Sequence, residues 1–163
     1  MSYIDTSVIV AALNSLDPRQ QKAREILEKE ELKIVSELTV VELSSVLSKR
    51  RELVSSISSE LNIDEELVII TMILYIFKRF SLTYTNVDGQ VYVPLIGKIY
   101  KPVSFAIDLS VKTGLKTLDL LHLAYAKILK EEGIVNKFVT ADEDFLKIKK
   151  TIEKSLNIKL QLL

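Results

Sequence analysis

The chain of 163 residues contains no cysteine, which excludes disulfide bonds, thiolate zinc sites and cysteine nucleophiles. It also lacks a long apolar run. The most apolar stretch, residues 68–77, falls well short of the ~20 residues that a membrane-spanning helix needs. No basic segment precedes the first apolar run, which Asp5 interrupts, so no signal peptide is expected. These absences predict a soluble, cytoplasmic protein.

A net charge is also missing, because 22 lysines and arginines balance 22 aspartates and glutamates. No global field therefore draws the protein to nucleic acid, and a phosphate-bearing substrate would need a local basic patch or metal ions. The apolar share of 48% and the length allow a sizeable core. Without an internal repeat, low-complexity tract or internal boundary, we expect one domain over residues 1–163.

Short apolar segments alternate with segments of helical periodicity along the chain. This alternation predicts an α/β fold of three layers, α/β/α, around a central parallel sheet of four to five short strands. The expected strands lie at the N-terminus and at residues 32–35, 137–140 and 158–162. The expected helices lie at residues 18–30, 39–51, 64–80, 103–113, 117–132 and 142–150.

Two further segments do not fit the alternation. Residues 83–87 and 91–93 flank Asp88 and Gly89, a pair that tight hairpin turns prefer, so we predict a β-ribbon excursion near residues 83–100. Residues 55–59 are rich in serine and are interpreted as a polar break between helices.

Asp5 lies inside a run of tyrosine, isoleucine, valine and small residues that reads as a buried strand. A charge cannot be buried there without a partner. In an open α/β sheet, however, the carboxyl end of a strand can present an aspartate to a ligand. Asp5 is therefore predicted to form one corner of an acidic pocket.

Three further acids stand close to a small hydroxyl residue near the start of a predicted helix: Glu42, Asp119 and Asp142. Four converging carboxylates repel one another unless hard divalent cations neutralise them, and oxygen ligands favour Mg²⁺ or Mn²⁺. Such ions activate a water molecule and stabilise in-line displacement at a phosphodiester.

Structural roles remain open for several of these acids. Glu42 follows Thr39 by three residues, which is the spacing of a capping box. Asp119 and Asp142 could serve as partners of helix dipoles, and Asp144 fits the same description and is a second-line ligand at most.

Residues 4–7, Ile-Asp-Thr-Ser, resemble the opening of PIN-domain ribonucleases, particularly of the VapC toxin type. That family also has a glutamate early in its second long helix, as at Glu42, and an aspartate at the head of a late helix, as at Asp119. Its Thr-x-Asp-x-Asp-Phe segment is matched by residues 140–145. Order and approximate spacing agree over residues 1–54 and 101–163.

The resemblance implies a metal-dependent endoribonuclease that cuts single-stranded RNA. It implies the following catalytic and Mg²⁺- or Mn²⁺-binding residues: Asp5, Glu42, Asp119 and Asp142. Ser7 and Thr140 would be supporting hydroxyls that orient carboxylates or bind water of the metal. Family members commonly dimerise, and a small antitoxin holds the toxin type inactive. A homodimer and an antitoxin are therefore expected, with the apolar faces of helices 18–30 and 39–51 as the partner groove.

His122 lies one helical turn after Asp119 and on the same helix face. It could hydrogen-bond a carboxylate or a phosphate, although a lone histidine on such a helix is more often packed and locally satisfied. Lys147, Lys149 and Lys150 are candidates for contacts with the RNA backbone if they flank the pocket.

Other functions stay open beside the toxin. The chain could be a PIN-like RNA-processing nuclease without an antitoxin, or a non-catalytic PIN-like binding module. An aspartyl-phosphate enzyme also places an aspartate at the end of its first strand. The phosphatase type, however, needs a second aspartate two residues on, where Ser7 stands, and a receiver domain places its phosphoacceptor on a later strand.

Overall fold

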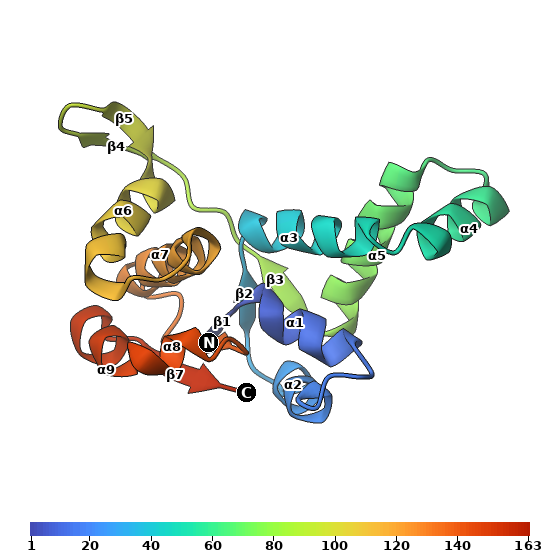
Figure 1. Cartoon of the computed structure of the whole chain (residues 1–163), viewed down its shortest axis with the longest axis horizontal. Coiled ribbons are helices and arrows are strands. Elements are labelled where there is room, and N and C mark those ends of the chain that lie inside the picture. The colour runs from blue at the N-terminus through green and yellow to red at the C-terminus, as the bar shows by residue number, and fades with distance from the viewer.

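A five-stranded sheet lies at the centre of the computed structural model, which describes all 163 residues (Figure 1). Its order is β3-β2-β1-β6-β7, and all four pairings are parallel. The strands are β1 (Ser2–Ile4), β2 (Lys33–Val35), β3 (Leu82–Tyr84), β6 (Lys137–Thr140) and β7 (Lys159–Leu162). The predicted α/β class with a central parallel sheet is confirmed.

Helices cover both faces of this sheet. They are α1 (Thr6–Leu13), α2 (Gln20–Leu27), α3 (Glu37–Ser48), α4 (Arg51–Leu61), α5 (Glu65–Arg79), α6 (Lys101–Thr113), α7 (Thr117–Glu131), α8 (Asp144–Lys147), α9 (Lys149–Thr151) and the π-helix Ile152–Leu156. None of them is long and apolar enough to cross a membrane.

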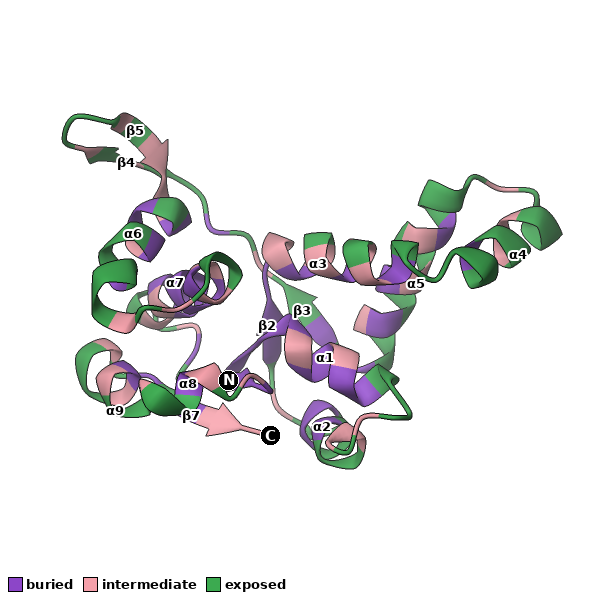
Figure 2. Cartoon of the chain, viewed as in Figure 1, coloured by how far each residue is buried: buried purple, intermediate pink, exposed green.

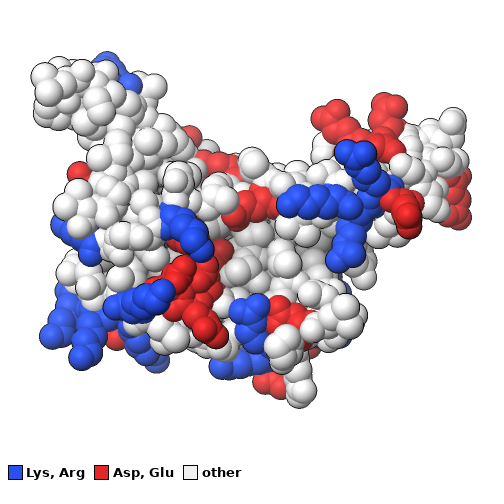
Figure 3. Space-filling model, in the orientation of Figure 1, with Lys and Arg blue, Asp and Glu red and all other residues white.

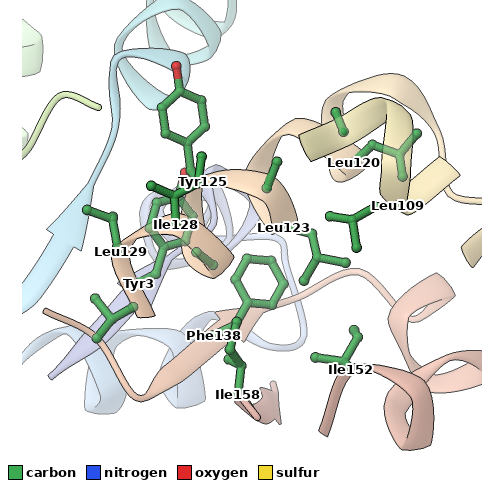
Figure 4. Close-up of a cluster of buried hydrophobic side chains, with 14 of the residues drawn as sticks. Tyr3, Leu109, Leu120, Leu123, Tyr125, Ile128, Leu129, Phe138, Ile152 and Ile158 are labelled. Atoms are coloured by element: carbon green, nitrogen blue, oxygen red, sulfur yellow. The ribbon is translucent and has the colours of Figure 1, made fainter. Parts of the chain in front are cut away.

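Two apolar cores result because successive side chains of a strand point to opposite faces. Tyr3 and Phe138 pack with α6, α7 and the C-terminal helices, and Figure 4 shows this cluster around Leu123 and Ile128. On the opposite face, the next residue of β1, Ile4, packs with α1, α2, α3 and α5. The strands at the centre are accordingly buried (Figure 2). This frame fixes β1 at the middle of the molecule.

The predicted polar break at residues 55–59 is wrong, because α4 runs through it. Val54 is buried and Ile57 is half-buried, so apolar residues at helical spacing attach one side of α4 to α5. The serines lie mostly on the exposed side, where their polarity does not oppose the helix. The helix expected over residues 39–51 is correspondingly α3, and it ends at Ser48.

The ribbon exists, but its predicted turn is wrong. Residues 83 and 84 belong to β3, which pairs with β2 in the main sheet, and Asp88-Gly89 is not the hairpin turn. The hairpin is β4 (Gln90–Val93) with β5 (Gly97–Tyr100), closed by residues 94–96. Gly97 has φ +101°, which a residue with a side chain rarely adopts, and so permits the turn there. The hairpin projects from the body beyond α6 (Figure 1).

Candidate active site

The site lies at the carboxyl ends of β1 and β6, which are neighbours in the sheet. Asp5 follows the last residue of β1, and Asp142 follows β6 by two residues. Because parallel strands end at the same edge, the two carboxylates are brought to one place, as ligand sites of open α/β sheets require.

Asp5 is 5% exposed and its carboxylate is held by neighbouring hydroxyls. Ser7 Oγ donates to Asp5 Oδ2 at 2.7 Å, and Thr140 Oγ1 donates to the same oxygen at 2.5 Å. Asp5 is also the N-cap of α1, since Oδ1 accepts the backbone N–H of Ser7 at 3.3 Å. That structural role was missed from the sequence, although the small hydroxyl residues that follow Asp5 indicated a helix start.

The same two hydroxyls also order the loop that bears Asp142. Ser7 Oγ accepts the Ala141 N–H at 3.0 Å, and Thr140 Oγ1 accepts the Asp142 N–H at 3.0 Å. Asp142 Oδ1 in turn accepts the backbone N–H of Asp144 at 2.8 Å. Ser7 and Thr140 therefore connect the Asp5 and Asp142 segments across the edge of the sheet.

Glu42 contacts His122 and does not cap the start of a helix. Helix α3 begins at Glu37 with Ser36 in the N-cap position, so Glu42 lies in the second turn and the capping-box interpretation is wrong. His122 Nε2 lies 2.7 Å from Glu42 Oε2 and 3.5 Å from Asp5 Oδ1. Ligand atoms of Asp5, Glu42 and His122 lie within 4.8 Å of one another, which is close enough to hold a metal ion.

The contact between Glu42 and His122 shifts the pKa values of both side chains. Burial raises the pKa of Glu42, but the hydrogen bond and charge of His122 outweigh burial and leave it below its ordinary value. Burial lowers the pKa of His122, but Glu42 and Asp5 outweigh it and leave the pKa of the imidazole raised. An imidazole held this way acts as a partner for the carboxylates.

Asp119, in the first turn of α7, completes the acidic cluster. Its Oδ2 is buried and has no hydrogen-bond partner. Burial, and after it the negative charges of Asp142 and Asp5, raise the pKa of Asp119 to about 6. An unpaired buried oxygen among like charges is costly unless a cation binds, so the donor set fits a hard divalent ion.

Asp144 does not join the cluster in the same way. Its carboxylate pairs with Lys147 Nζ at 2.7 Å and with Lys116 Nζ at 3.3 Å. These hydrogen bonds lower the pKa of Asp144. Arg19 also contacts the loop that bears Asp142, because its Nη1 donates to the Ala141 carbonyl at 2.6 Å.

Acidic side chains gather in the middle of one face of the molecule, with lysines and arginines on both sides of them (Figure 3). Lys116, Lys147 and Arg19 are the bases whose contacts tie them to this region. A polyanion that approaches the acids can therefore meet positive charge on either side, although the whole chain is neutral.

Two buried residues behind the acids were missed from the sequence. Tyr3 OH lies 2.9 Å from His122 Nδ1 and 2.7 Å from Ser36 Oγ. The only sequence signal was the position of Tyr3 two residues before Asp5, in the run that predicts the first strand.

A second concave feature lies away from the acids. It is an apolar groove of ≈ 1060 Å³ between α1, α3, α4 and α5. Leu47, Leu53 and Ile57 line it, and Arg50 and Arg51 are among its few charged residues. Residues of the predicted helix 39–51 line this groove, whereas α2, within the predicted helix 18–30, packs into the core and contributes no lining residue, so the placement of a partner there stays a prediction.

The protein-family model described as PIN domain matches residues 2–151. Among solved structures, a chain of VapBC2 from Rickettsia felis, bound to a DNA fragment from its promoter, is 18% identical with a TM-score of 0.56. The alignment covers 99% of this chain and 98% of that one. VapC20 from Mycobacterium tuberculosis, a sarcin–ricin-loop-cleaving toxin, is 16% identical with a TM-score of 0.56, over 90% of this chain and 94% of its own. Both likenesses concern the fold, and no curated protein matches the sequence.

Proposed function

The chain belongs to the PIN-domain family, and on that premise we propose that it is a metal-dependent endoribonuclease that cleaves single-stranded RNA. The observation that supports this most is the unpaired, buried Oδ2 of Asp119 beside Asp5 and Asp142. The proposed Mg²⁺ or Mn²⁺ ligands are the four acids of the cluster: Asp5, Glu42, Asp119 and Asp142.

Carboxylate oxygens are the donors that Mg²⁺ and Mn²⁺ prefer, and the chain offers no thiolate that would favour a softer ion. When bound, such an ion supplies positive charge that activates water and stabilises the developing charge of a phosphodiester undergoing displacement.

The residues of the chain prepare the site for this chemistry. Ser7 and Thr140 fix Asp5 through its Oδ2, which keeps Oδ1 on the side of His122. Lys116 and Lys147 lie next to the acids and can contact phosphates of the RNA backbone, which position the strand without reading its sequence.

The test is cleavage of a synthetic single-stranded RNA with added Mn²⁺. We expect Asp5→Asn to lower the rate by more than about 100-fold, since losing a ligand should exceed the effect of losing an outer-shell partner. Asparagine is as good an N-cap as aspartate, so this change removes the charge and keeps α1 capped.

Asp108→Asn is the matched control, because Asp108 is exposed and lies on α6. It should cleave at the wild-type rate. Cleavage that survives Asp5→Asn would rule out the proposed site. A wild-type protein that shows neither cleavage nor a thermal shift with Mn²⁺ would favour a non-catalytic binding module instead.

We also propose that the protein is the toxin of a toxin–antitoxin pair, with the antitoxin in the apolar groove. Exposed Leu53 and Leu61 line this groove beside Arg50 and Arg51. These features suit an amphipathic helix with acidic residues along one side. The likeness in fold to a VapBC complex supports the same assignment.

Copurification with the product of a short neighbouring gene tests this. Leu53→Asp should abolish capture, because it places a charge against an apolar partner. Leu95→Asp is the control, since Leu95 is fully exposed at the tip of the hairpin. If no such gene lies next to this one, and the protein cleaves RNA without an inhibiting partner, an RNA-processing nuclease is favoured instead.

A further inference from the structure

A buried chain of hydrogen bonds leads from the acidic cluster into the interior. It runs from Glu42 Oε2 to His122 Nε2 at 2.7 Å, from His122 Nδ1 to Tyr3 OH at 2.9 Å, and from Tyr3 OH to Ser36 Oγ at 2.7 Å. His122 is 1% exposed, and Tyr3 and Ser36 are fully buried. The chain joins α3, α7, β1 and the residue that follows β2.

The surroundings of the imidazole fix the direction of these bonds. His122 Nε2 faces two carboxylate oxygens, Glu42 Oε2 at 2.7 Å and Asp5 Oδ1 at 3.5 Å, and the Thr6 hydroxyl at 3.5 Å, whose oxygen can also accept from it. Ionised carboxylates only accept hydrogen bonds, so Nε2 must hold a proton. In a neutral imidazole the other nitrogen is then an acceptor, and Tyr3 OH is the group that faces it.

Tyr3 therefore donates to Nδ1 and uses its oxygen to accept from Ser36 Oγ. Reversing the chain would aim a nitrogen lone pair at two carboxylates in a place where water cannot screen the repulsion. The aromatic ring of Tyr3 is held as well, because it stacks on Phe138 and meets His122 edge-on.

We propose that Tyr3 and Ser36 lock His122 as its Nε2–H tautomer, which makes His122 a positioning residue for the Glu42 and Asp5 carboxylates and not a metal ligand. The inference rests on the proposed function, because it concerns how the same acids are presented to a divalent ion. The three ligand atoms are near enough for His122 to complete a metal site. With Nε2 protonated, however, no lone pair remains for an ion on that side.

The tautomer can be read directly, because His122 is the only histidine of the chain. A long-range ¹H–¹⁵N NMR spectrum of the Mg²⁺-saturated protein contains one imidazole, and it is recorded from about pH 7 to about pH 10 so that the neutral form is reached although the pKa of His122 is raised. We expect the pattern of an imidazole protonated at Nε2. A neutral imidazole with its proton on Nδ1, or one that stays doubly protonated up to about pH 10, overturns the proposal.

The ligand question has its own readout. In the Mn²⁺-loaded protein, a coordinated imidazole gives a ¹⁴N coupling in the electron spin-echo spectrum. The proposal expects no such coupling. Its presence in the wild type and loss in His122→Ala would show that His122 is a ligand.

Variants separate positioning from packing. His122→Ala should weaken Mn²⁺ binding about tenfold, as removal of an outer-shell partner does. His122→Gln keeps an N–H donor near the position of Nε2 and should lie closer to the wild type than to His122→Ala. Equal losses in both variants overturn the donor role.

Tyr3→Phe should weaken Mn²⁺ binding in the same direction and mix the two tautomers, since the ring is kept and the donor to Nδ1 is lost. Ser36→Ala tests the same chain with a smaller change, should Tyr3→Phe fail to fold. Tyr125→Phe is the matched control, because this buried hydroxyl on α7 bonds Glu37 instead. Unchanged spectra and affinity in both test variants overturn the proposal.

None of these measurements uses RNA. A wild-type protein that binds Mn²⁺ through the acids but cuts no RNA contradicts the proposed function and leaves the tautomer assignment intact. A protein that cuts RNA but shows a metal-coordinated imidazole supports the proposed function and contradicts the tautomer assignment.

Discussion

Asp119 shows what the acidic cluster costs when no cation is bound. Its pKa is raised to about 6, so ionisation is less favourable in the folded than in the unfolded chain. The corresponding loss of stability develops as the pH rises from the ordinary carboxyl value through about 6, and it is complete above that. Asp119→Asn removes the charge and should therefore stabilise the metal-free protein at neutral pH.

We expect a gain of roughly 1 kcal/mol, discounted because Asp119 is only half-buried, and a rise in Tm of about 2–4 °C in EDTA. Added Mn²⁺ should then raise the Tm of the wild type more than that of the variant. Thermal unfolding with and without EDTA measures both effects, with Asp108→Asn as the control. If Asp119→Asn had a lower Tm than the wild type in EDTA, the charge of Asp119 would not be destabilising, contrary to this prediction.

Thr140 allows a test of how firmly Asp5 must be held. Thr140→Ala removes the hydroxyl that donates to Asp5 Oδ2 and accepts from the Asp142 N–H. We expect kcat to fall about tenfold, the low end of the effect of an outer-shell partner, with KM for RNA nearly unchanged. Thr140→Ser keeps the hydroxyl and should retain most of the rate. Equal losses in both variants would assign the effect to packing.

At the scale of single residues, sequence reasoning works where chemistry is local. Asp5 is recognisable because a charge stands in an apolar strand, and Ser7 lies two residues away. Tyr3 and Ser36 are not recognisable, because they are 33 residues apart and Tyr3 is 119 residues from His122. Pairing of β1 with β2 brings Tyr3 to Ser36, and the core that Tyr3 shares with α7 brings it to His122.

Among the elements, the hairpin is attached to the body through a half-buried tyrosine at its end. Tyr100 OH lies within hydrogen-bond distance of Glu37 Oε1 and of the Val87 carbonyl, which share its one proton, and it lies 3.2 Å from Tyr125 OH. Burial, and after it the hydrogen bond to Glu37, raise the pKa of Tyr100 to about 12, so it stays a donor at neutral pH. Glu37 Oε2 has no partner, which leaves this cluster dependent on its two tyrosines.

Tyr100→Phe should therefore destabilise the protein by about 1–3 kcal/mol, because it leaves the carbonyl of the buried Val87 without this donor and removes one of the two tyrosine hydroxyls at Glu37 Oε1. Tyr92→Phe changes the same residue type on the exposed side of the hairpin and should have almost no effect. Urea unfolding of both variants checks this. Equal stabilities would mean that the hairpin contributes nothing to the body through Tyr100.

The elements that were predicted wrongly share a cause. Residues 83–84 have the β-propensity expected of a ribbon, but they pair with the open edge of β2 and form β3 of the main sheet. The serines of α4 favour a loop, but Val54 and contacts with α5 outweigh their low helix propensity. Elements whose partners are distant in sequence are thus the ones that local patterns misplace.

At the scale of the whole molecule, alternation of strands and helices predicts the parallel sheet and the edge where Asp5 and Asp142 meet. It does not predict which helix faces stay uncovered. One such face lies on α6, where Val103, Ile107 and Val111 are 40%, 43% and 91% exposed at successive turns. The family resemblance led us to expect a homodimer, and we propose this stripe as its interface.

A twofold arrangement would pair the stripe with itself, with α6 of one copy antiparallel to α6 of the other. Val111→Asp should convert the dimer to a monomer in light scattering after gel filtration, because it places a charge against an apolar surface. Val41→Asp, at an exposed valine on α3, should remain dimeric. A wild-type protein that is monomeric at micromolar concentration, or a Val111→Asp variant that stays dimeric, would exclude this interface.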